Sequence, residues 1–134
     1  MSTETNKEIV RRFINEYQTK ARENVADELI ADDFVDHSAL PGFTPDKKGL
    51  KDLFNMLRAA FHGFRAEIYE QIAEGDKVVT RKSFFGIHNG EFFGVAPTGR
   101  PIHIDVIDIL TIKNGQIADH RCEVDLAGLM AQIN

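Results

Sequence analysis

The sequence contains a single cysteine, Cys122, among its 134 residues. One cysteine cannot form an internal disulfide, and by itself it supplies no zinc-binding pattern. This scarcity excludes the class of small domains that disulfide bonds or a structural metal hold together. Any role of Cys122 is therefore local.

Long stretches of one character are also missing. No basic run is long enough to follow a phosphate backbone, and 16 Lys and Arg residues are outnumbered by 21 Asp and Glu, for a net charge of −5. We therefore expect no nucleic acid partner. No stretch approaches the roughly 18 apolar residues that span a bilayer, and residues 1–10 show neither the basic start nor the apolar run of a signal peptide. These absences predict a cytoplasmic protein with no membrane partner.

What is present is an ordinary globular composition, with 43% apolar and 28% charged residues. The length lies within the roughly 100 to 200 residues of one domain and suffices for one core. We expect a single domain over residues 1–134.

The first part of the chain has the pattern of helices. Thr5 and Glu8 have the spacing of a capping box, and the apolar residues after them recur every three or four positions: Ile9, Val10, Phe13 and Tyr17. Asn24 can cap a second, short helix that ends before Asp32 and Asp33. A third helix is expected to start at Thr44–Pro45 and to end at Gly63, with these residues facing inward: Leu50, Leu53, Phe54, Leu57 and Phe61.

From Phe64 onward the hydrophobic period changes to two, which is typical of strands. Turns at 74–76 and 89–90 predict strands at 77–88 and 91–95, and residues 102–112 and 116–124 form a last hairpin before a closing helix capped by Asp125. Helices followed by an antiparallel meander predict an α+β fold, with helices covering one face of a curved sheet.

The register of the last hairpin decides which side chains face each other. A two-residue loop at 114–115 would set apolar side chains opposite charges. A three-residue loop at 113–115, with Gly115 in a left-handed bulge, sets apolar opposite apolar. The second register predicts these pairs: Val106 with Cys122, Asp108 with His120, and Leu110 with Ala118.

An Asp and a His on an apolar sheet face are costly unless they are paired or functional. Asp108 and His120 are either a buried pair that fixes the register or a general acid and base in a pocket. Cys122 points to the same side, where it is either a nucleophile or a small hydrophobe.

Several other residues are candidates for contacting a ligand. We expect the substrate-binding set to be Tyr17, Leu53, His37, His88, Val106 and Cys122. Tyr17 is either a core aromatic or a hydrogen-bond donor to a ligand. Asp36 and His37 could reach the pocket mouth or simply form a turn. The His, Asp and Cys residues that could bind a metal are not spaced in the sequence as in known metal sites. We therefore expect neither a metal nor another cofactor.

Four segments carry a resemblance to a known family: residues 8–12, 86–94, 96–101 and 114–130. They resemble the SnoaL-like polyketide and ester cyclases, and the similarity runs nearly end to end. The resemblance implies the cone-shaped α+β barrel of the nuclear transport factor 2 superfamily, often assembled as a dimer. It also implies a cofactor-free intramolecular aldol condensation of a polyketide ester, in which an acidic side chain takes a proton from carbon.

The chain departs from the family at one place. In the cyclases an aspartate stands two residues after the His of the Asp-His-Arg run, and here that place holds Cys122. Asp108 stands where the family has a pocket histidine, while His120 and Tyr17 match. Three hypotheses follow: a cofactor-free enzyme for a small apolar or polyketide-like carbonyl compound, with Asp108 and His120 as acid and base; a small-molecule binding domain without chemistry; or a structural dimerisation domain.

The outer sheet face suggests an assembly. It places Ile107 and Ile109 among polar neighbours, a pattern that suits a two-fold interface. We expect a homodimer through this face. The alternative is that the closing helix of the same chain covers it.

Overall fold

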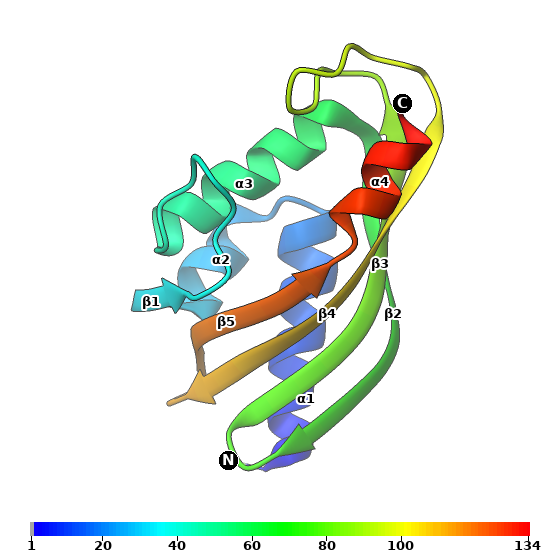
Figure 1. The fold of residues 1–134 in the computed structure, drawn as a ribbon. Coiled ribbons are helices and arrows are strands. Elements are labelled where there is room, and N and C mark those ends of the chain that lie inside the picture. Colours follow the sequence, from blue (N-terminus) through cyan, green and yellow to red (C-terminus); the bar gives the residue numbers. More distant parts are fainter. Residues whose placement is uncertain (1) are drawn as a thin grey trace.

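The computed structural model describes residues 2–134 and shows helices packed on one curved sheet (Figure 1). The helical elements are α1 (Thr3–Arg12), the π-helical η1 (Phe13–Thr19), α2 (Glu23–Leu29), α3 (Lys47–Ala60) and α4 (Leu126–Gln132). The strands are β1 (Ile30–Asp36), β2 (Phe61–Glu74), β3 (Lys77–His88), β4 (Pro101–Lys113) and β5 (Gln116–Val124), in the sheet order β1-β5-β4-β3-β2. The expected α+β class is confirmed.

The sheet is mixed and open rather than antiparallel throughout, because β1 pairs with β5 in parallel. The strand β1 was not predicted from the sequence, because the adjacent Asp32 and Asp33 are typical of the end of a helix. Both side chains are exposed, while Ile30, Phe34 and Asp36 are buried. A strand at the sheet edge can carry acidic residues on its outer face and still contribute alternate residues to the core.

The helix starts differ from the predicted ones. Ser2 caps α1 by accepting from the Thr5 amide, so the helix begins before the predicted capping box. Arg22 precedes α2 and offers no side-chain cap, so Asn24 lies inside that helix. Asp46 caps α3 through the Gly49 amide at 2.9 Å, in place of Thr44. The helix then ends at Ala60 and runs straight into β2, so Gly63 is a strand residue.

The π-helical segment η1 changes which residues of the first helix face inward. Its hydrogen bonds span five residues instead of four, which brings residues five apart onto one face. Phe13 and Gln18 both line the interior as a result, and Gln18 is only 4% exposed. A regular 3.6-residue period gave no reason to expect a buried glutamine there.

The β4–β5 hairpin keeps the predicted faces but not the predicted partners. Asn114 and Gly115 form a two-residue turn with φ values of +53° and +76°, as a type I′ turn requires. A bulge beside Thr111 absorbs the extra residue. The observed pairs are Val106 with Val124, Asp108 with Cys122, and Leu110 with His120, so the predicted partners were wrong by two residues.

Residues 89–100 form a loop rather than the predicted strand at 91–95. A single bridge between Phe92 and Val95 closes a tight turn, in which Phe93 adopts a φ of +44° and Gly94 a φ of +81°. Phe92 is buried while Phe93 stays exposed. The run therefore folds back on itself and carries one aromatic ring into the core.

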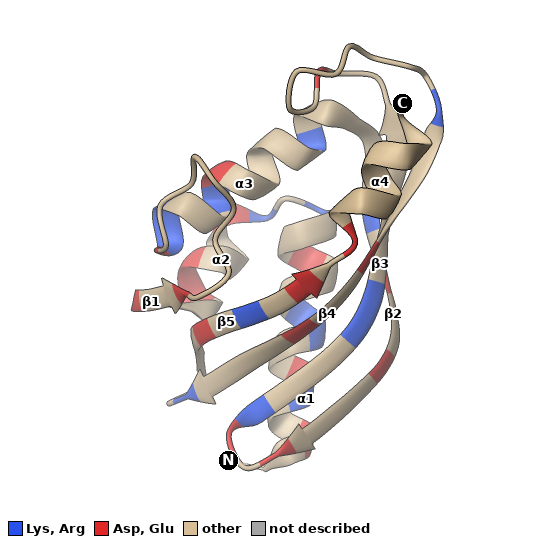
Figure 2. Ribbon diagram, in the orientation of Figure 1, with Lys and Arg blue, Asp and Glu red and all other residues tan. Residues whose placement is uncertain are grey.

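Charged residues of both signs are interspersed along the helices and strands (Figure 2). The predicted cap of the closing helix is confirmed, because Asp125 accepts from the Gly128 amide at 2.8 Å.

Over residues 2–134, none of the helices has the length and apolar character needed to cross a bilayer.

Candidate active site

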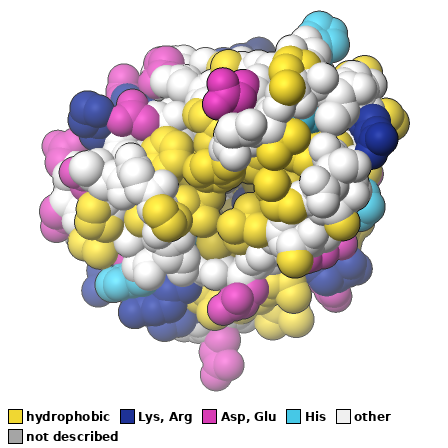
Figure 3. Space-filling view, turned by 45° about the horizontal axis from the view of Figure 1, so that its top comes forward, with side chains coloured by type: hydrophobic (Ala, Val, Ile, Leu, Met, Phe, Trp, Pro, Cys, Tyr) yellow, Lys and Arg dark blue, Asp and Glu magenta, His cyan; other side chains and the backbone are white. Residues whose placement is uncertain are grey.

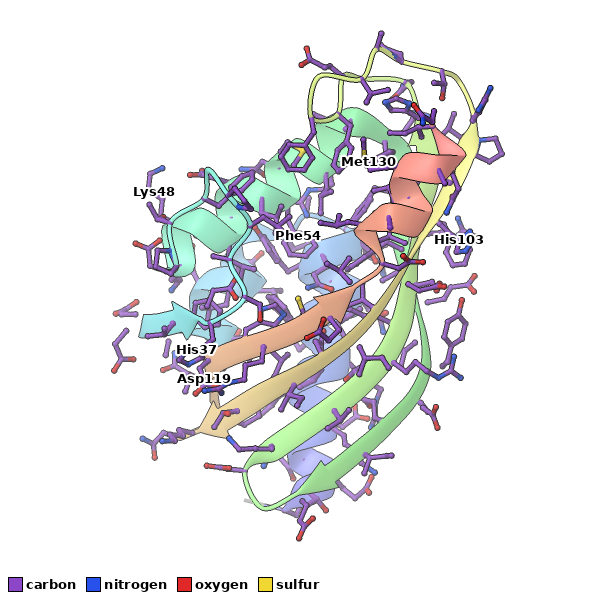
Figure 4. The ribbon with its side chains drawn as sticks, in the orientation of Figure 1. His37, Lys48, Phe54, His103, Asp119 and Met130 are labelled. Atoms are coloured by element: carbon purple, nitrogen blue, oxygen red, sulfur yellow. The ribbon has the colours of Figure 1, made fainter. Side chains whose placement is uncertain are left out.

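A cavity lies between the inner face of the sheet and the elements η1, α3 and α4. Figure 3 shows a hollow rimmed by hydrophobic side chains, and Figure 4 shows Phe54 extending from α3 toward the sheet. The volume of the cavity is about 80 Å³. Most of its wall is apolar, including Leu53, Phe54 and Leu57 from α3, Val106 and Leu110 from β4, and Leu126 and Leu129 from α4. Such a wall with a few polar groups is typical of small-molecule sites.

One polar group of the wall is a buried ion pair between neighbouring strands. Lys82 Nζ of β3 lies 2.7 Å from Asp108 Oδ2 of β4, and both side chains are 2% exposed. Gln18 Oε1 accepts a hydrogen bond from Lys82 Nζ at 3.1 Å. Asp108 Oδ1 is buried and has no hydrogen-bond partner among residues 2–134. A carboxylate oxygen in this state is costly to maintain without a ligand or a function.

The second polar group is an Asp–His pair at the edge of the sheet. His120 Nδ1 of β5 lies 2.9 Å from Asp36 Oδ1 at the end of β1, which also accepts from the Ser38 amide at 2.9 Å. The predicted partner of His120 was Asp108, so the pairing expected for the site is corrected. The missed parallel strand β1 brings Asp36 next to β5 and thereby creates the observed pair.

This pairing sets the charge of the imidazole. Burial alone would lower the pKa of His120, but the hydrogen bond to Asp36 and the neighbouring Cys122 outweigh it and raise the pKa to about 9. Burial would also raise the pKa of Asp36, yet the hydrogen bond from His120 lowers it. At neutral pH the pair is therefore an imidazolium beside a carboxylate.

Cys122 lies between the two polar groups on the cavity wall. It is directly opposite Asp108 in the β4–β5 ladder, and its amide donates to Ser38 Oγ at 3.0 Å. The cavity thus places a thiol, a carboxylate and an imidazolium on adjacent strands. Within residues 2–134 no group of three His, Cys, Asp or Glu side chains is arranged to hold a metal ion.

The predicted site residues divide into two sets. Those on the cavity wall are Leu53, Val106, Asp108, His120 and Cys122. Tyr17, His37 and His88 lie elsewhere. Tyr17 is fully buried, its hydroxyl has no hydrogen-bond partner among residues 2–134, and burial raises its pKa. His88 is buried against Phe61 and approaches Thr98 Oγ1 at 3.0 Å, so it anchors the 89–100 loop. His37 lies at the surface beside Asp119, as Figure 4 shows.

Two functional candidates, Lys82 and Gln18, were missed by sequence reasoning. The alternation of β3 indicates an inward side chain for Lys82, because it lies on the same face of the strand as Thr80, Phe84 and His88. All three of these residues are buried. For Gln18 no sequence signal existed, since its burial depends on the π-helical geometry of η1.

Comparison with known families matches residues 8–133 to the model described as SnoaL-like polyketide cyclase. The chain belongs to this family. Among characterised relatives it is 28% identical over 130 residues to the aklanonic acid methyl ester cyclase DauD of Streptomyces sp. (strain C5), covering 94% of this chain and 80% of that protein. It is 27% identical over 123 residues to the nogalonic acid methyl ester cyclase of Streptomyces nogalater, covering 90% and 91%.

Solved structures of related proteins share the fold closely. IdmH from Streptomyces antibioticus superimposes with a TM-score of 0.85 at 28% identity, covering 95% of this chain and 96% of IdmH. TsrD from Streptomyces laurentii gives a TM-score of 0.89 at 22% identity, covering 100% and 98%. A Catenulispora acidiphila protein with a ketosteroid isomerase-like fold gives a TM-score of 0.73 at 22% identity, covering 94% and 92%. The last two likenesses concern the fold alone.

Proposed function

We propose that this protein is a cofactor-free cyclase that closes a ring by forming a carbon–carbon bond within a small, largely apolar carbonyl compound. The observation that carries the proposal is Asp108, a buried carboxylate on the wall of an apolar cavity, whose Oδ1 has no hydrogen-bond partner among residues 2–134. A carboxylate with poor solvation and a free lone pair is suited to remove a proton from a carbon next to a carbonyl.

The register supports Asp108 as the base despite the cysteine at the family's aspartate position. Asp108 pairs directly with Cys122 across β4 and β5, and both line the same cavity. A carboxylate on β4 therefore lies one strand away from the position that the family resemblance assigns to it. The binding-domain alternative rests on the loss of that carboxylate, and the geometry offers a replacement for it.

His120 is suited to the acid role rather than the base role. The Nδ1 atom of His120 is hydrogen-bonded to Asp36, so a ligand can form a hydrogen bond with the ring only through its other nitrogen, Nε2. With its pKa raised to about 9, the imidazolium carries a proton at neutral pH. We assign the following reaction steps. Asp108 takes a proton from carbon, the enolate carbon attacks an internal carbonyl carbon, and His120 protonates the resulting alkoxide. Proton return from Asp108 to His120 through solvent resets the site, and the product is an isomer of the substrate.

The charge balance of the cavity indicates a neutral substrate. The two buried pairs, Lys82 with Asp108 and Asp36 with His120, cancel each other's charges. Within residues 2–134 the two cations on the cavity wall are each paired with a carboxylate in the resting site, so an additional ionised carboxylate would enter without a counter-charge, which is costly. This favours an ester over a free acid, and the two characterised relatives are named as methyl ester cyclases.

The first chemical step can be tested without the natural substrate. The wild type should exchange the α-protons of an aromatic ketone bearing a methyl ester for deuterium in D₂O, observed by NMR. Asp108→Asn should slow exchange by about 10² to 10⁴-fold, the usual contribution of a general base. The matched control, Asp105→Asn, makes the same change on the exposed outer side of β4 and should exchange normally. Equal rates for the two variants would contradict the proposal.

We also propose that two copies assemble through the outer face of the sheet. Ile107 is 49% exposed there, among charges of both signs that include Arg81, Asp105 and Glu123. The closing helix does not cover this side, because its Leu126 and Leu129 line the cavity on the inner side. An apolar centre with a mixed-charge rim suits a self-complementary two-fold contact.

A further inference from the structure

We propose that Lys82 is a third catalytic residue, whose ammonium binds the carbonyl oxygen that becomes the enolate while Asp108 removes the adjacent proton. This inference rests on the proposed cyclase function. It adds a group on β3 that neither the sequence analysis nor the acid–base assignment includes.

Lys82 occupies a position where an apolar residue would be cheaper. Its side chain is 2% exposed and its ammonium lies 5.0 Å from the centre of the Phe84 ring, in a wall that is otherwise mostly hydrophobic. Replacing a buried ion pair by apolar side chains is often neutral or stabilising, so stability alone does not account for the pair. A buried lysine on a cavity wall is suited to a neutral ligand that develops negative charge on an oxygen atom as it reacts.

The ammonium has hydrogen-bonding capacity left for such a ligand. Of its three hydrogens, one is donated to Gln18 Oε1. A second can be directed at the Asp108 carboxylate, whose Oδ2 lies 2.7 Å from Nζ. Among residues 2–134 these are the two acceptors close to Nζ. At least one hydrogen therefore remains for an oxygen atom in the cavity.

The two open positions form one recognition site. Asp108 contacts Lys82 through Oδ2 and leaves Oδ1 unpartnered, so a ligand that reaches Oδ1 lies within one carboxylate group of the ammonium. A ligand that fits this site presents a hydrogen to Asp108 Oδ1 and an adjacent oxygen atom to Lys82 Nζ. A C–H group adjacent to a carbonyl meets this requirement, and so does the hydroxyl group of a phenol.

The strand order places the base between two cations. Lys82, Asp108 and His120 lie on the consecutive strands β3, β4 and β5, which are spaced about 4.8 Å apart. Ring closure by an aldol step develops negative charge on two oxygens, first the enolate oxygen and then the alkoxide oxygen. With Lys82 at the first and His120 at the second, each charge forms beside a preorganised donor in an apolar site. When the C–H bond breaks, its electron pair becomes the C=C bond of the enolate and the carbonyl π pair moves to the oxygen held by Lys82; as that carbonyl re-forms, the C=C pair makes the new C–C bond.

The alternative is that Lys82 only holds Asp108 in place, and ligand binding can separate the two roles. The Asp108→Asn variant imitates the protonated base and frees the ammonium for an anion. The probe is 4-nitrophenol at a pH where it is ionised, since its phenolate imitates the enolate oxygen and absorbs at longer wavelength than the neutral phenol. Nitrobenzene, which lacks the oxygen, measures the apolar contribution. Affinities are measured by calorimetry and absorbance.

In the Asp108→Asn background, adding Lys82→Met should weaken phenolate binding by about 10 to 100-fold, the range for a hydrogen bond to a charged group. Nitrobenzene binding should change less than threefold. The control Lys77→Met, in the same background, removes a lysine of the same strand that bonds Thr111 away from the cavity, and it should leave both affinities unchanged. Phenolate binding that survives Lys82→Met would overturn the proposal, because His120 would then be holding the anion.

A second measurement applies if Asp108→Asn does not fold. Below the pKa of free 4-nitrophenol, the wild type should bind the dye with the phenolate spectrum, and Lys82→Met should bind it with the phenol spectrum or not at all. Identical spectra would overturn the proposal. These binding results do not depend on turnover. Undiminished deuterium exchange by Asp108→Asn would instead refute the cyclase mechanism, whatever Lys82 binds.

Discussion

The Asp36–His120 pair makes the stability of the protein depend on pH in the alkaline range. The pKa of His120 is raised from 6.5 to about 9 in the folded state. Each pKa unit corresponds to 1.36 kcal/mol, so the protonated imidazole contributes about 3 kcal/mol to folding. The His120 side chain is 17% exposed, so solvent screening of the pair is limited. Against the 5 to 15 kcal/mol typical of a domain, this is a substantial share.

The sign follows from linkage. A group whose pKa is higher in the folded than in the unfolded state binds its proton more tightly when folded. The contribution of His120 is therefore complete below pH 6.5 and is lost as the pH rises from 6.5 through about 9. Asp36, whose pKa is lowered, acts in the opposite direction and loses its contribution as the pH falls through its folded value.

Urea unfolding followed by circular dichroism between pH 6 and pH 9.5 measures this contribution. We expect the wild type to lose about 3 kcal/mol more than His120→Gln over that range. The control His103→Gln changes an exposed histidine of β4 and should follow the wild type. NMR titration of the imidazole supplies an independent value. A His120 midpoint at or below 7, or equal pH dependence of wild type and His120→Gln, would refute the reasoning.

Three further outcomes are expected. Asp36→Asn should move the NMR titration midpoint of His120 down toward 6.5, because the hydrogen bond to the carboxylate raises it; an unchanged midpoint would mean that another group sets it. Gly49→Ala should lower the urea midpoint although alanine favours helices, because a Cβ atom there would lie 1.7 Å from the Thr44 carbonyl oxygen; a stabilised variant would contradict this packing. In sedimentation at micromolar concentration the wild type should be a dimer and Ile107→Lys a monomer; a monomeric wild type, or a folded variant that still dimerises, would disprove the outer-face contact.

The parts of the fold that could be predicted are those encoded by local periodicity. The three-to-four-residue pattern around Val10 and Phe13 indicates a helix, and the alternation after Phe64 indicates strands, because each depends only on which face meets the core. The strand β1 could not be predicted in this way. Its partner β5 lies more than 80 residues away in sequence, and the exposed Asp32 and Asp33 hide its alternation.

The site was partly predictable for the same reason. Asp108, His120 and Cys122 were expected on one face, and the cavity lining agrees, since side-chain parity survives a register shift of two residues. Their partners were not predictable. A bulge replaces a longer turn in the hairpin, and β1 brings Asp36 to His120 from elsewhere in the chain.

The exchange of a carboxylate for a thiol at position 122 is compatible with retained chemistry because of what surrounds it. Asp108 is the cross-strand partner of Cys122, so it presents its carboxylate to the same cavity about one strand spacing away. A carboxylate moved to the centre of the sheet needs a new counter-ion, and Lys82 on the next strand supplies it at 2.7 Å. Gln18 completes the group only because η1 turns a polar residue inward. Asp108, Lys82 and Gln18 are therefore joined by direct contacts, and Cys122 lies opposite Asp108 on the wall of the same cavity, so a substitution at position 122 leaves the carboxylate and its partners in place.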